Sequence, residues 1–404
     1  MRAWLVALSL AACGDGLATS TDASIDSTPE TRGFVRVEYR GDVDPRAVSV
    51  LFQDADSTLV LATRLDGSGL ANCLMDSGGF VTLSFPDRQL LTYVDVPVDE
   101  PLLFEHFSNP DPSATPVTVK VPAETGATSY RLYSSCGARE IFGAQLQPIG
   151  ISLGACETTA DILVSAITPA HERFAFRDEV SLSAPIIFES AYQPEVVGMI
   201  EVAGTPPSSV IASQTLVRGA AELLPRRMTA IGTGAGIGFV TMPRFASATQ
   251  LTHLEAIASD LHVLEWEPAA VDTVVFWPAT PLRSYVERPV MHETDPIVIW
   301  RESADGAIAD GLYVELGWAD QKLVRHTWFV LAPRTAATTL TLPTLPYPDL
   351  VPSAVTTDIT RFDSFAAENG FAATRAVFRL GRSLDRAMWF TDGERGRVVY
   401  QALD

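Results

Sequence analysis

Hydrophobic and polar residues alternate with a period of two along most of the chain. Val35, Val37 and Tyr39, for example, alternate with Arg36 and Glu38. The same alternation recurs in residues 48–52, 81–85, 117–121, 312–318 and 339–342. Each run is short and is bounded by Gly, Pro, Asp or Ser, which is typical of half-buried antiparallel strands joined by turns. The pattern predicts an all-β fold of tandem antiparallel β-sandwich domains with few or no helices.

Two stretches, residues 213–224 and 365–373, have helix-forming composition. Helix propensity is a weak guide, because packing can make either stretch extended. The chain also contains 27 Pro and 27 Gly, spread along its length. That distribution favours many turns and few helices.

The first 13 residues have the organisation of an export signal. Arg2 is followed by apolar residues 3–10 and then by Ala11-Ala12-Cys13. The apolar segment is shorter than the roughly 20 residues needed to span a bilayer. The run Leu10-Ala-Ala-Cys13 resembles the lipobox of bacterial lipoproteins, which implies removal of residues 1–12 and lipid attachment to Cys13. The alternative is an ordinary signal peptide with a chance cysteine.

Residues 13–32 are rich in Ser, Thr, Asp and Gly, and we expect them to form a flexible tether. The net charge of −20 makes nucleic acid an unlikely partner and argues against adsorption on an anionic bilayer. We therefore expect the membrane to be a partner only through the lipid on Cys13. In lipoproteins of this type, Gly14 after the cysteine implies the outer membrane or cell surface.

Residues 33–110 are expected to form the first folded domain. They hold a strand-like run at 48–56, another at 59–63, the turn Asp66-Gly-Ser-Gly69 and a third run at 80–83. This succession is similar to carboxypeptidase regulatory-like domains, which are small transthyretin-like β-sandwiches. It departs from that pattern at Asp56-Ser57, where Asp-Gly is commoner. The resemblance implies a fold and no peptidase activity.

Two further β-rich domains are expected, at residues 111–258 and 259–404. Leu264-Glu-Trp-Glu-Pro268 and residues 340–346 resemble segments of fibronectin type III domains, a class of immunoglobulin-like sandwich. Over most of its length the chain also resembles surface lipoproteins built from several sandwiches.

Three cysteines follow Cys13. Cys136 and Cys156 flank adjacent predicted strands in an exported chain, so we predict a disulfide between them, worth about 3 kcal/mol. Cys73 is then a buried thiol outside that disulfide. Pairings that involve Cys73 stay open. No Cys or His pair repeats with metal-ligand spacing, so no metal site is expected.

No motif indicates catalysis. The glycine-rich run at 232–238 lies in a β-rich context and does not follow the dinucleotide fingerprint, so a hairpin or bulge is expected there. Asp54, Asp56 and Asp66 lack the spacing of a calcium loop and are expected in solvated turns. The six histidines are scattered, with no H-E-x-x-H, and no G-x-S-x-G elbow occurs. We expect neither a catalytic centre nor a cofactor.

Six tryptophans follow the signal, all after residue 265: Trp266, Trp277, Trp300, Trp318, Trp328 and Trp389. Most are expected in sandwich cores. Trp277 and Trp300 follow very apolar runs and are either core residues or stacking platforms for a ligand. The expected function is non-catalytic adhesion, display or scaffolding, with a protein or glycan ligand. The alternatives are a carbohydrate-binding accessory protein and an unrecognised secreted hydrolase.

Overall fold

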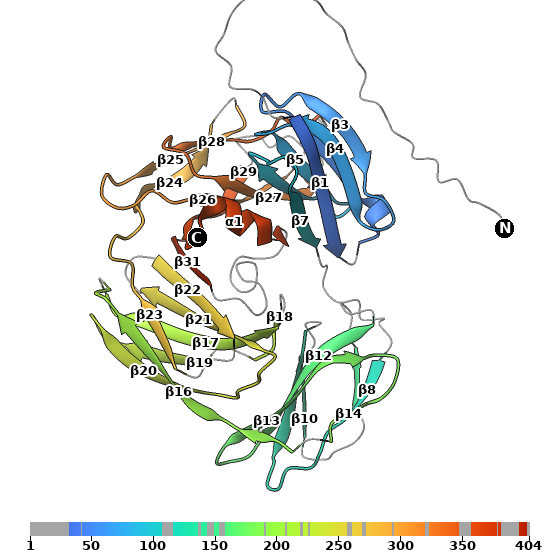
Figure 1. The fold of residues 1–404 in the computed structure, drawn as a ribbon, viewed down its shortest axis with the longest axis vertical. Helices are drawn as coiled ribbons and strands as arrows, with labels where there is room; N and C mark the ends of the chain where they lie inside the picture. The colour runs from blue at the N-terminus through green and yellow to red at the C-terminus, as the bar shows by residue number, and fades with distance from the viewer. Residues whose placement is uncertain are drawn as a thin grey trace, which may run out of the picture.

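The predicted alternation forms strands throughout the computed structural model, and the chain is all-β as predicted. The structure describes residues 32–41, 43–106, 116–135, 139–143, 149–152, 158–189, 191–206, 208–218, 221–224, 227–256, 261–268, 272–292, 295–319, 323–346, 357–377, 379–380 and 396–401. Within these ranges α1 (Gly370–Val377) is the one α-helix. Figure 1 shows four β-sandwiches around a common centre, near which α1 lies.

The first sandwich is formed by the N-terminal strands. Its strands are β1 (Arg32–Gly41), β2 (Ser49–Gln53), β3 (Leu59–Arg64), β4 (Leu70–Asp76), β5 (Phe80–Ser84), β6 (Gln89–Val94) and β7 (Pro101–His106), with a 3₁₀ turn, η1 (Pro45–Ala47). One layer has the order β30-β7-β1-β4, where β30 (Arg379–Leu380) comes from the C-terminal region. The predicted alternation of β1 is confirmed, since Val35, Val37 and Tyr39 are buried between the layers.

The second sandwich has its own core. Its strands are β8 (Pro116–Lys120), β9 (Ser129–Ser134), β10 (Arg139–Gly143), β11 (Ile149–Ser152), β12 (Thr159–Ile167), β13 (Glu172–Ser181), β14 (Ile186–Ile187) and β15 (Gln193–Pro194). They form the sheets β10-β9-β12-β13-β15 and β11-β8-β14. Leu132, Ile162 and Val119 meet between the two sheets.

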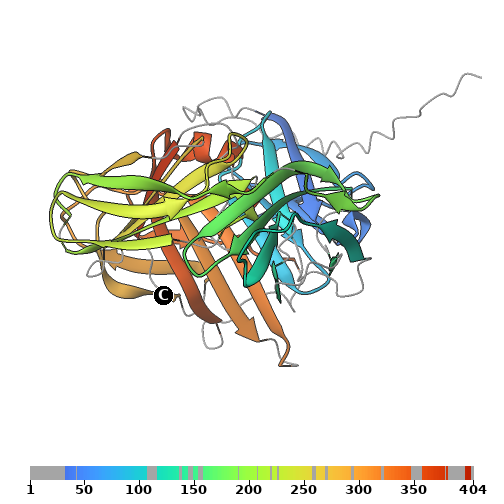
Figure 2. The same ribbon diagram turned by 90° about the horizontal axis from the view of Figure 1, so that it is seen from below.

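The third sandwich follows directly. Its strands are β16 (Val196–Ala203), β17 (Val210–Arg218), β18 (Ala221–Glu222), β19 (Arg227–Ile231), β20 (Gly236–Met242), β21 (Thr249–Ala256), β22 (Leu261–Pro268) and β23 (Thr273–Phe276). The sheet β20-β16-β23 covers the sheet that contains β17, β21 and β22. Figures 1 and 2 place β16 and β20 on the outer rim of the molecule, across from β1.

The fourth sandwich is formed by the C-terminal strands. They are β24 (Tyr285–Met291), β25 (Ile297–Glu302), β26 (Gly311–Ala319), β27 (Arg325–Pro333), β28 (Thr339–Thr341), β29 (Thr357–Ala367) and β31 (Gly396–Gln401). The sheet β24-β25-β28 covers β26, β27 and β29. Trp300 and Trp328 fill the core between these layers.

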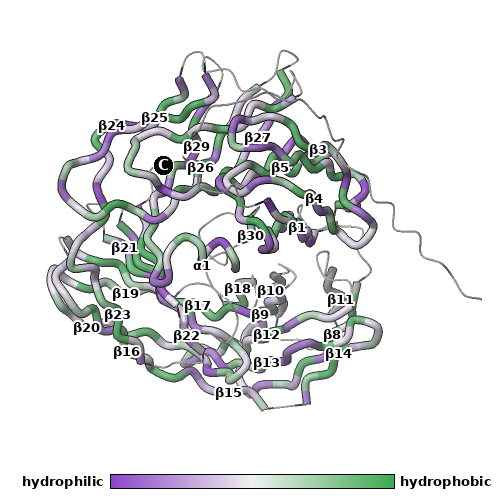
Figure 3. The backbone as a smooth tube through the Cα atoms, turned by 45° about the horizontal axis from the view of Figure 1, so that its top comes forward, coloured by the Kyte–Doolittle hydropathy of each residue, from purple (hydrophilic) through white to green (hydrophobic). Residues whose placement is uncertain are grey.

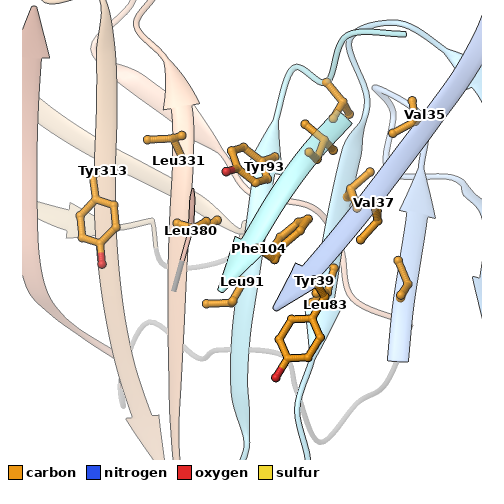
Figure 4. Packing of buried hydrophobic residues seen from close by; sticks show 14 of the residues in the cluster. Val35, Val37, Tyr39, Leu83, Leu91, Tyr93, Phe104, Tyr313, Leu331 and Leu380 are labelled. Carbon is orange, nitrogen blue, oxygen red and sulfur yellow. The ribbon is translucent and has the colours of Figure 1, made fainter. Parts of the chain in front are cut away.

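One sheet of 13 strands joins the first, third and fourth sandwiches. Its order is β18-β17-β21-β22-β31-β29-β26-β27-β6-β5-β2-β3, with β19 paired to β17. The junction between the N-terminal and C-terminal regions is a parallel pairing of β6 with β27. Figure 4 shows the result: Tyr313 and Leu331 from the C-terminal strands lie in one hydrophobic cluster with Tyr93 and Phe104.

The predicted domain boundaries differ from this arrangement. The predicted domain at 111–258 spans two sandwiches, which meet between β15 and β16. The predicted boundary at 258/259 falls between β21 and β22, which pair along their whole length from Thr249–Pro268 to Ala256–Leu261. The predicted boundary at 110 falls between β7 and β8, but β30 adds a C-terminal strand to the first sandwich. Local alternation identifies strands and carries no information on which distant strands pair.

Candidate interaction surface

The outer face of the sheet β20-β16-β23 is apolar although it is exposed. Ile200, Val202 and Val275 on the inner face are buried in the core of the third sandwich. On the outer face, large apolar side chains keep between 37% and 63% of their surface exposed: Val197, Ile237, Phe239, Val274 and Phe276. Figure 3 shows hydrophobic positions along these strands at the rim. An antiparallel sheet with one solvated face ordinarily carries polar residues there.

The strand register brings these side chains together. Met199 of β16 lies opposite Phe239 of β20. Glu201, two residues further along β16, lies between Ile237 on one side and Val274 on the other. Side chains directly opposite on one face of a sheet are close enough to touch. We define the apolar face as Val197, Met199, Ile237, Phe239, Val274 and Phe276, with Glu201 in its middle.

Glycines occupy the first two inward positions of β20, ahead of the buried Val240 and Met242, so the large side chains of residues 236–239 are on the outside. A Cβ atom at Gly236 would lie 2.6 Å from Ile231 Cγ2, and one at Gly238 would lie 2.5 Å from Thr229 Cγ2. Both glycines therefore let β20 pack closely on β19. Ile237 and Phe239, which alternate with them, face outward. The glycine-rich run is a connection between two sheets rather than the expected hairpin or bulge, because β19 pairs with β17, whereas β20 pairs with β16 in unbroken register.

Trp277 and Trp300 do not form a stacking platform. Trp277 is 6% exposed and packs in the core of the third sandwich, where its backbone N–H donates to Ala203 O at 2.7 Å. Trp300 is 2% exposed, and its ring lies 4.9 Å from the guanidinium carbon of Arg334. A stacking platform must present the face of its ring to solvent. Trp277 and Trp300 are therefore core residues and not ligand-stacking residues. The other described tryptophans are also buried: Trp266, Trp318 and Trp328.

The exposed aromatic rings of the apolar face belong to Phe239 and Phe276, which the sequence pattern was not used to predict. Strand β23 alternates inward and outward, so Val275 and Trp277 are buried and Phe276 is 55% exposed. The signal was present in the sequence, because a strand whose residues are all apolar must expose every second side chain unless both faces are covered.

The cysteine predictions fall mostly outside the described residues. Cys13, Cys136 and Cys156 all lie there, so the lipid site and the disulfide stay predictions. Cys73 lies on β4 and is buried, as expected. Within the described ranges, no helix has the length and apolar content needed to cross a membrane.

The polar residues weighed as catalytic or metal-binding candidates have structural partners. Asp66 Oδ1 accepts from Ser68 Oγ at 2.6 Å and from Leu70 N at 3.0 Å, and these bonds lower the pKa of its carboxyl. His253 and His262 share a hydrogen bond between Nε2 and Nδ1 at 3.0 Å. The described residues contain no group of three or more His, Cys, Asp or Glu side chains arranged to hold a metal ion.

Comparison with known proteins assigns the chain to no family. No family model matches the chain, and no curated protein matches it. A solved structure titled "The Bacillus anthracis TIE protein" is similar at 10% sequence identity with a TM-score of 0.15. The match covers 61% of this chain and 50% of that chain, so this chain spans half of that protein's length. A TM-score at this level supports no argument about fold or function.

Proposed function

We propose that the protein is a lipid-anchored, non-catalytic binding protein of the cell surface that acts in adhesion or scaffolding through the apolar face. The observation that carries this proposal is the composition of residues 236–239 of β20, where the glycines face inward and Ile237 and Phe239 face outward. Exposed contiguous apolar patches on a soluble surface mark interaction sites. Aromatic residues are enriched at protein–protein interfaces, which favours a protein partner.

The position of the apolar face supports contact away from the anchoring membrane. The described fold starts at Arg32, 19 positions after Cys13, so the first sandwich is the part of the fold nearest to the proposed anchor. The strands β16 and β20, which carry most of the apolar face, lie on the opposite side of the molecule from β1 (Figures 1 and 2). A net charge of −20 also opposes contact between the folded body and an anionic bilayer.

The binding proposal is tested by site-specific photo-crosslinking on cells that display the full chain. A benzophenone amino acid replaces Phe239 or Phe276, and the matched control replaces Phe34, which is 59% exposed on β1. We expect one partner protein to be captured from positions 239 and 276 but not from 34. Phe276→Ser should abolish capture from position 239. Equal capture from position 34, or adducts to lipid alone, would reject the proposal.

The anchor is tested separately with a clickable fatty acid. We expect the wild-type chain to be labelled and to fractionate with membranes, whereas Cys13→Ala is unlabelled. If Cys13→Ala remains labelled and membrane-bound, the lipid site is elsewhere.

The carbohydrate alternative now has weaker support. The rings that the apolar face offers are Phe239 and Phe276, and most of the side chains beside them on that face are apolar, with Glu201 and Thr241 as the polar exceptions. Sugar recognition needs polar groups that fix the hydroxyls. Binding of the full chain to a glycan array, lost in Phe239→Ser, would reverse this preference.

A further inference from the structure

Strand β20 has one edge that no described strand covers. It pairs with β16 on one side and is the last strand of the sheet β20-β16-β23 on the other. Met199 N–H donates to Asp272 Oδ1 at 2.9 Å, on the β23 side of β16. Met199 and the opposite Phe239 therefore form a pair without mutual hydrogen bonds, and the backbone N–H and C=O of Phe239 point to the free edge. The same holds for Ile237 and Thr241, two positions away on either side.

This edge lacks the features that ordinarily prevent strands from pairing between molecules. Strand β20 has seven residues, with unbroken register to β16, no proline and no charged side chain. An open edge is a template for another chain unless short length, charge, proline or a bulge prevents pairing.

The other edge strands that the structure describes are all short or charged. Those of four residues or fewer are β11, β14, β15, β18, β23, β28 and β30. The longer ones carry Arg64 (β3), Asp76 (β4), Glu140 (β10), Arg227 (β19) and Glu287 (β24). Among the described edges, β20 is therefore the one best suited to pairing with another chain.

The opposite edge of the same sheet is partly occupied. Trp277 N–H donates to Ala203 O, so Phe276, one residue earlier on β23, directs its backbone carbonyl away from β16. Arg397 Nη2 donates a hydrogen bond to this carbonyl. The available edge of the sheet is thus the β20 edge, which lies at the outer rim of the molecule (Figures 1 and 2).

The sequence of β20 is complementary to itself in antiparallel order. When Phe239 lies opposite Phe239 of a second copy, Ile237 lies opposite Thr241 and Thr241 lies opposite Ile237. Each of these residues directs its backbone groups to the free edge, so each pair can exchange both of its hydrogen bonds. No charged side chain of β20 faces another across the contact. A twofold contact of this kind uses the same surface on both molecules and closes after two copies.

We propose that the partner of this edge is a second copy of the chain, and that two copies form a twofold dimer by antiparallel pairing of β20 about Phe239. The two sheets then join in the order β23-β16-β20-β20-β16-β23, and the two apolar faces become one continuous surface. The outer side chains stay exposed in this dimer. The contact is therefore separate from the contact proposed for the apolar face.

The test measures the mass of the purified full chain by sedimentation velocity over a range of concentrations, in a Cys13→Ala background that removes association through lipid. We expect a reversible dimer. Phe239→Lys and Phe239→Glu should each raise the dissociation constant at least tenfold, because each places like charges opposite one another. An equimolar mixture of these two variants should dimerise again, because opposite charges then meet across the axis. Phe276→Lys, at a position 55% exposed on the same face, is the matched control and should dimerise like the parent chain.

The register is tested with introduced cysteines under oxidising conditions. Phe239→Cys should form a disulfide between two copies, since the Cα atoms of such a pair lie about 5.5 Å apart. Ile237→Cys should not cross-link alone, whereas a mixture of Ile237→Cys and Thr241→Cys should.

A monomer at every concentration would overturn the proposal and leave the edge to a different protein. Loss of the dimer in Phe276→Lys would also overturn it, because the apolar faces would then pack on each other. Failure of the mixed charge variants to associate, or cross-linking of Ile237→Cys alone, would reject the pairing about Phe239. These measurements contain no other protein, so failure of the apolar face to bind a partner on cells is recognised independently.

Discussion

The indole Nε1 of Trp328 donates a hydrogen bond to Thr92 Oγ1 at 2.8 Å across 236 positions of sequence. Trp328 lies on β27 and Thr92 on β6, at the parallel junction of the large sheet. Thr92 Oγ1 is also 2.8 Å from Thr82 Oγ1 on β5, and all three side chains are buried. Trp328, from the C-terminal region, thereby joins a series of buried hydrogen bonds in the first sandwich.

Thr92→Val should destabilise the protein more than Thr82→Val. Thr92→Val leaves both Trp328 Nε1 and Thr82 Oγ1 without their partner, which costs about 1–3 kcal/mol for each buried group. Thr82→Val removes one bond and keeps the bond to Trp328. Urea unfolding followed by tryptophan fluorescence measures both variants. Equal losses would show that the Trp328 bond contributes nothing.

Gly238→Ala should lower stability by about 1–3 kcal/mol, because the added Cβ is forced against Thr229 in a packed interior. Gly232→Ala is the matched control in the same connection, since a Cβ there has no atom within 4 Å. Thermal melts of the two variants provide the comparison. If Gly238→Ala melts with the wild type, β20 does not pack on β19 as described.

Phe239→Ser should leave the free energy of unfolding within about 0.5 kcal/mol of wild type, because its ring is 63% exposed. Val240→Ser, one residue further along β20 and buried, should cost about 1.5–3 kcal/mol. Chemical denaturation distinguishes the two. A large loss in Phe239→Ser would mean that the ring serves the fold and not a partner.

Arg334→Met should cost about 3–5 kcal/mol. Arg334 Nη2 lies 3.0 Å from Glu302 Oε2, and both side chains are almost fully buried, so the substitution leaves an uncompensated buried charge. Trp300 Nε1 also donates to Glu302 Oε1 at 2.7 Å. The double variant Arg334→Met/Glu302→Gln should recover part of the loss in the same unfolding assay. If the double variant is as unstable as Arg334→Met, the unpaired charge of Glu302 is not the cause of the lost stability.

Glu195→Gln should stabilise the protein at pH 7. Burial raises the pKa of Glu195 above its ordinary value, and the Glu172 carboxylate adds to this, although Arg227 opposes it. The fold thus favours the protonated acid. The stability that this group contributes is fully present below pH 4.5, its ordinary pKa, and is lost as the pH rises through the folded-state pKa.

Urea unfolding at pH 4 and pH 7 tests the direction of this pH dependence. The advantage of Glu195→Gln should be present at pH 7 and should shrink toward pH 4. Glu368→Gln, at an exposed position, is the matched control for removal of a carboxylate. A variant that is less stable than wild type at pH 7 would contradict the assignment.

Period-two alternation was sufficient to predict the fold class and many individual strands, because burial of one sheet face is a local property. Residues 213–224 show where local preference fails. Ser213 lies on β17, between β19 and β21, and two neighbouring strands override a helical composition. The β6–β27 pairing was beyond prediction, since nothing near Thr92 or Trp328 in the sequence specifies the other.

The candidate surface was only partly accessible to the same reasoning. Tryptophans were weighed as exposed rings because of their chemistry, yet alternation places Trp277 inside and Phe276 outside.

The junction of β6 with β27 also determines when the molecule can finish folding. Synthesis of the chain begins at its N-terminus, so β1 to β7 are available long before β27, β29 and β30. Their shared core and shared sheet cannot form until these late strands arrive, and such long-range pairing is slow to form. Strands β1 to β7 therefore keep an unpaired sheet edge and an incomplete core until those strands are present. Chaperone contact is most needed in that interval.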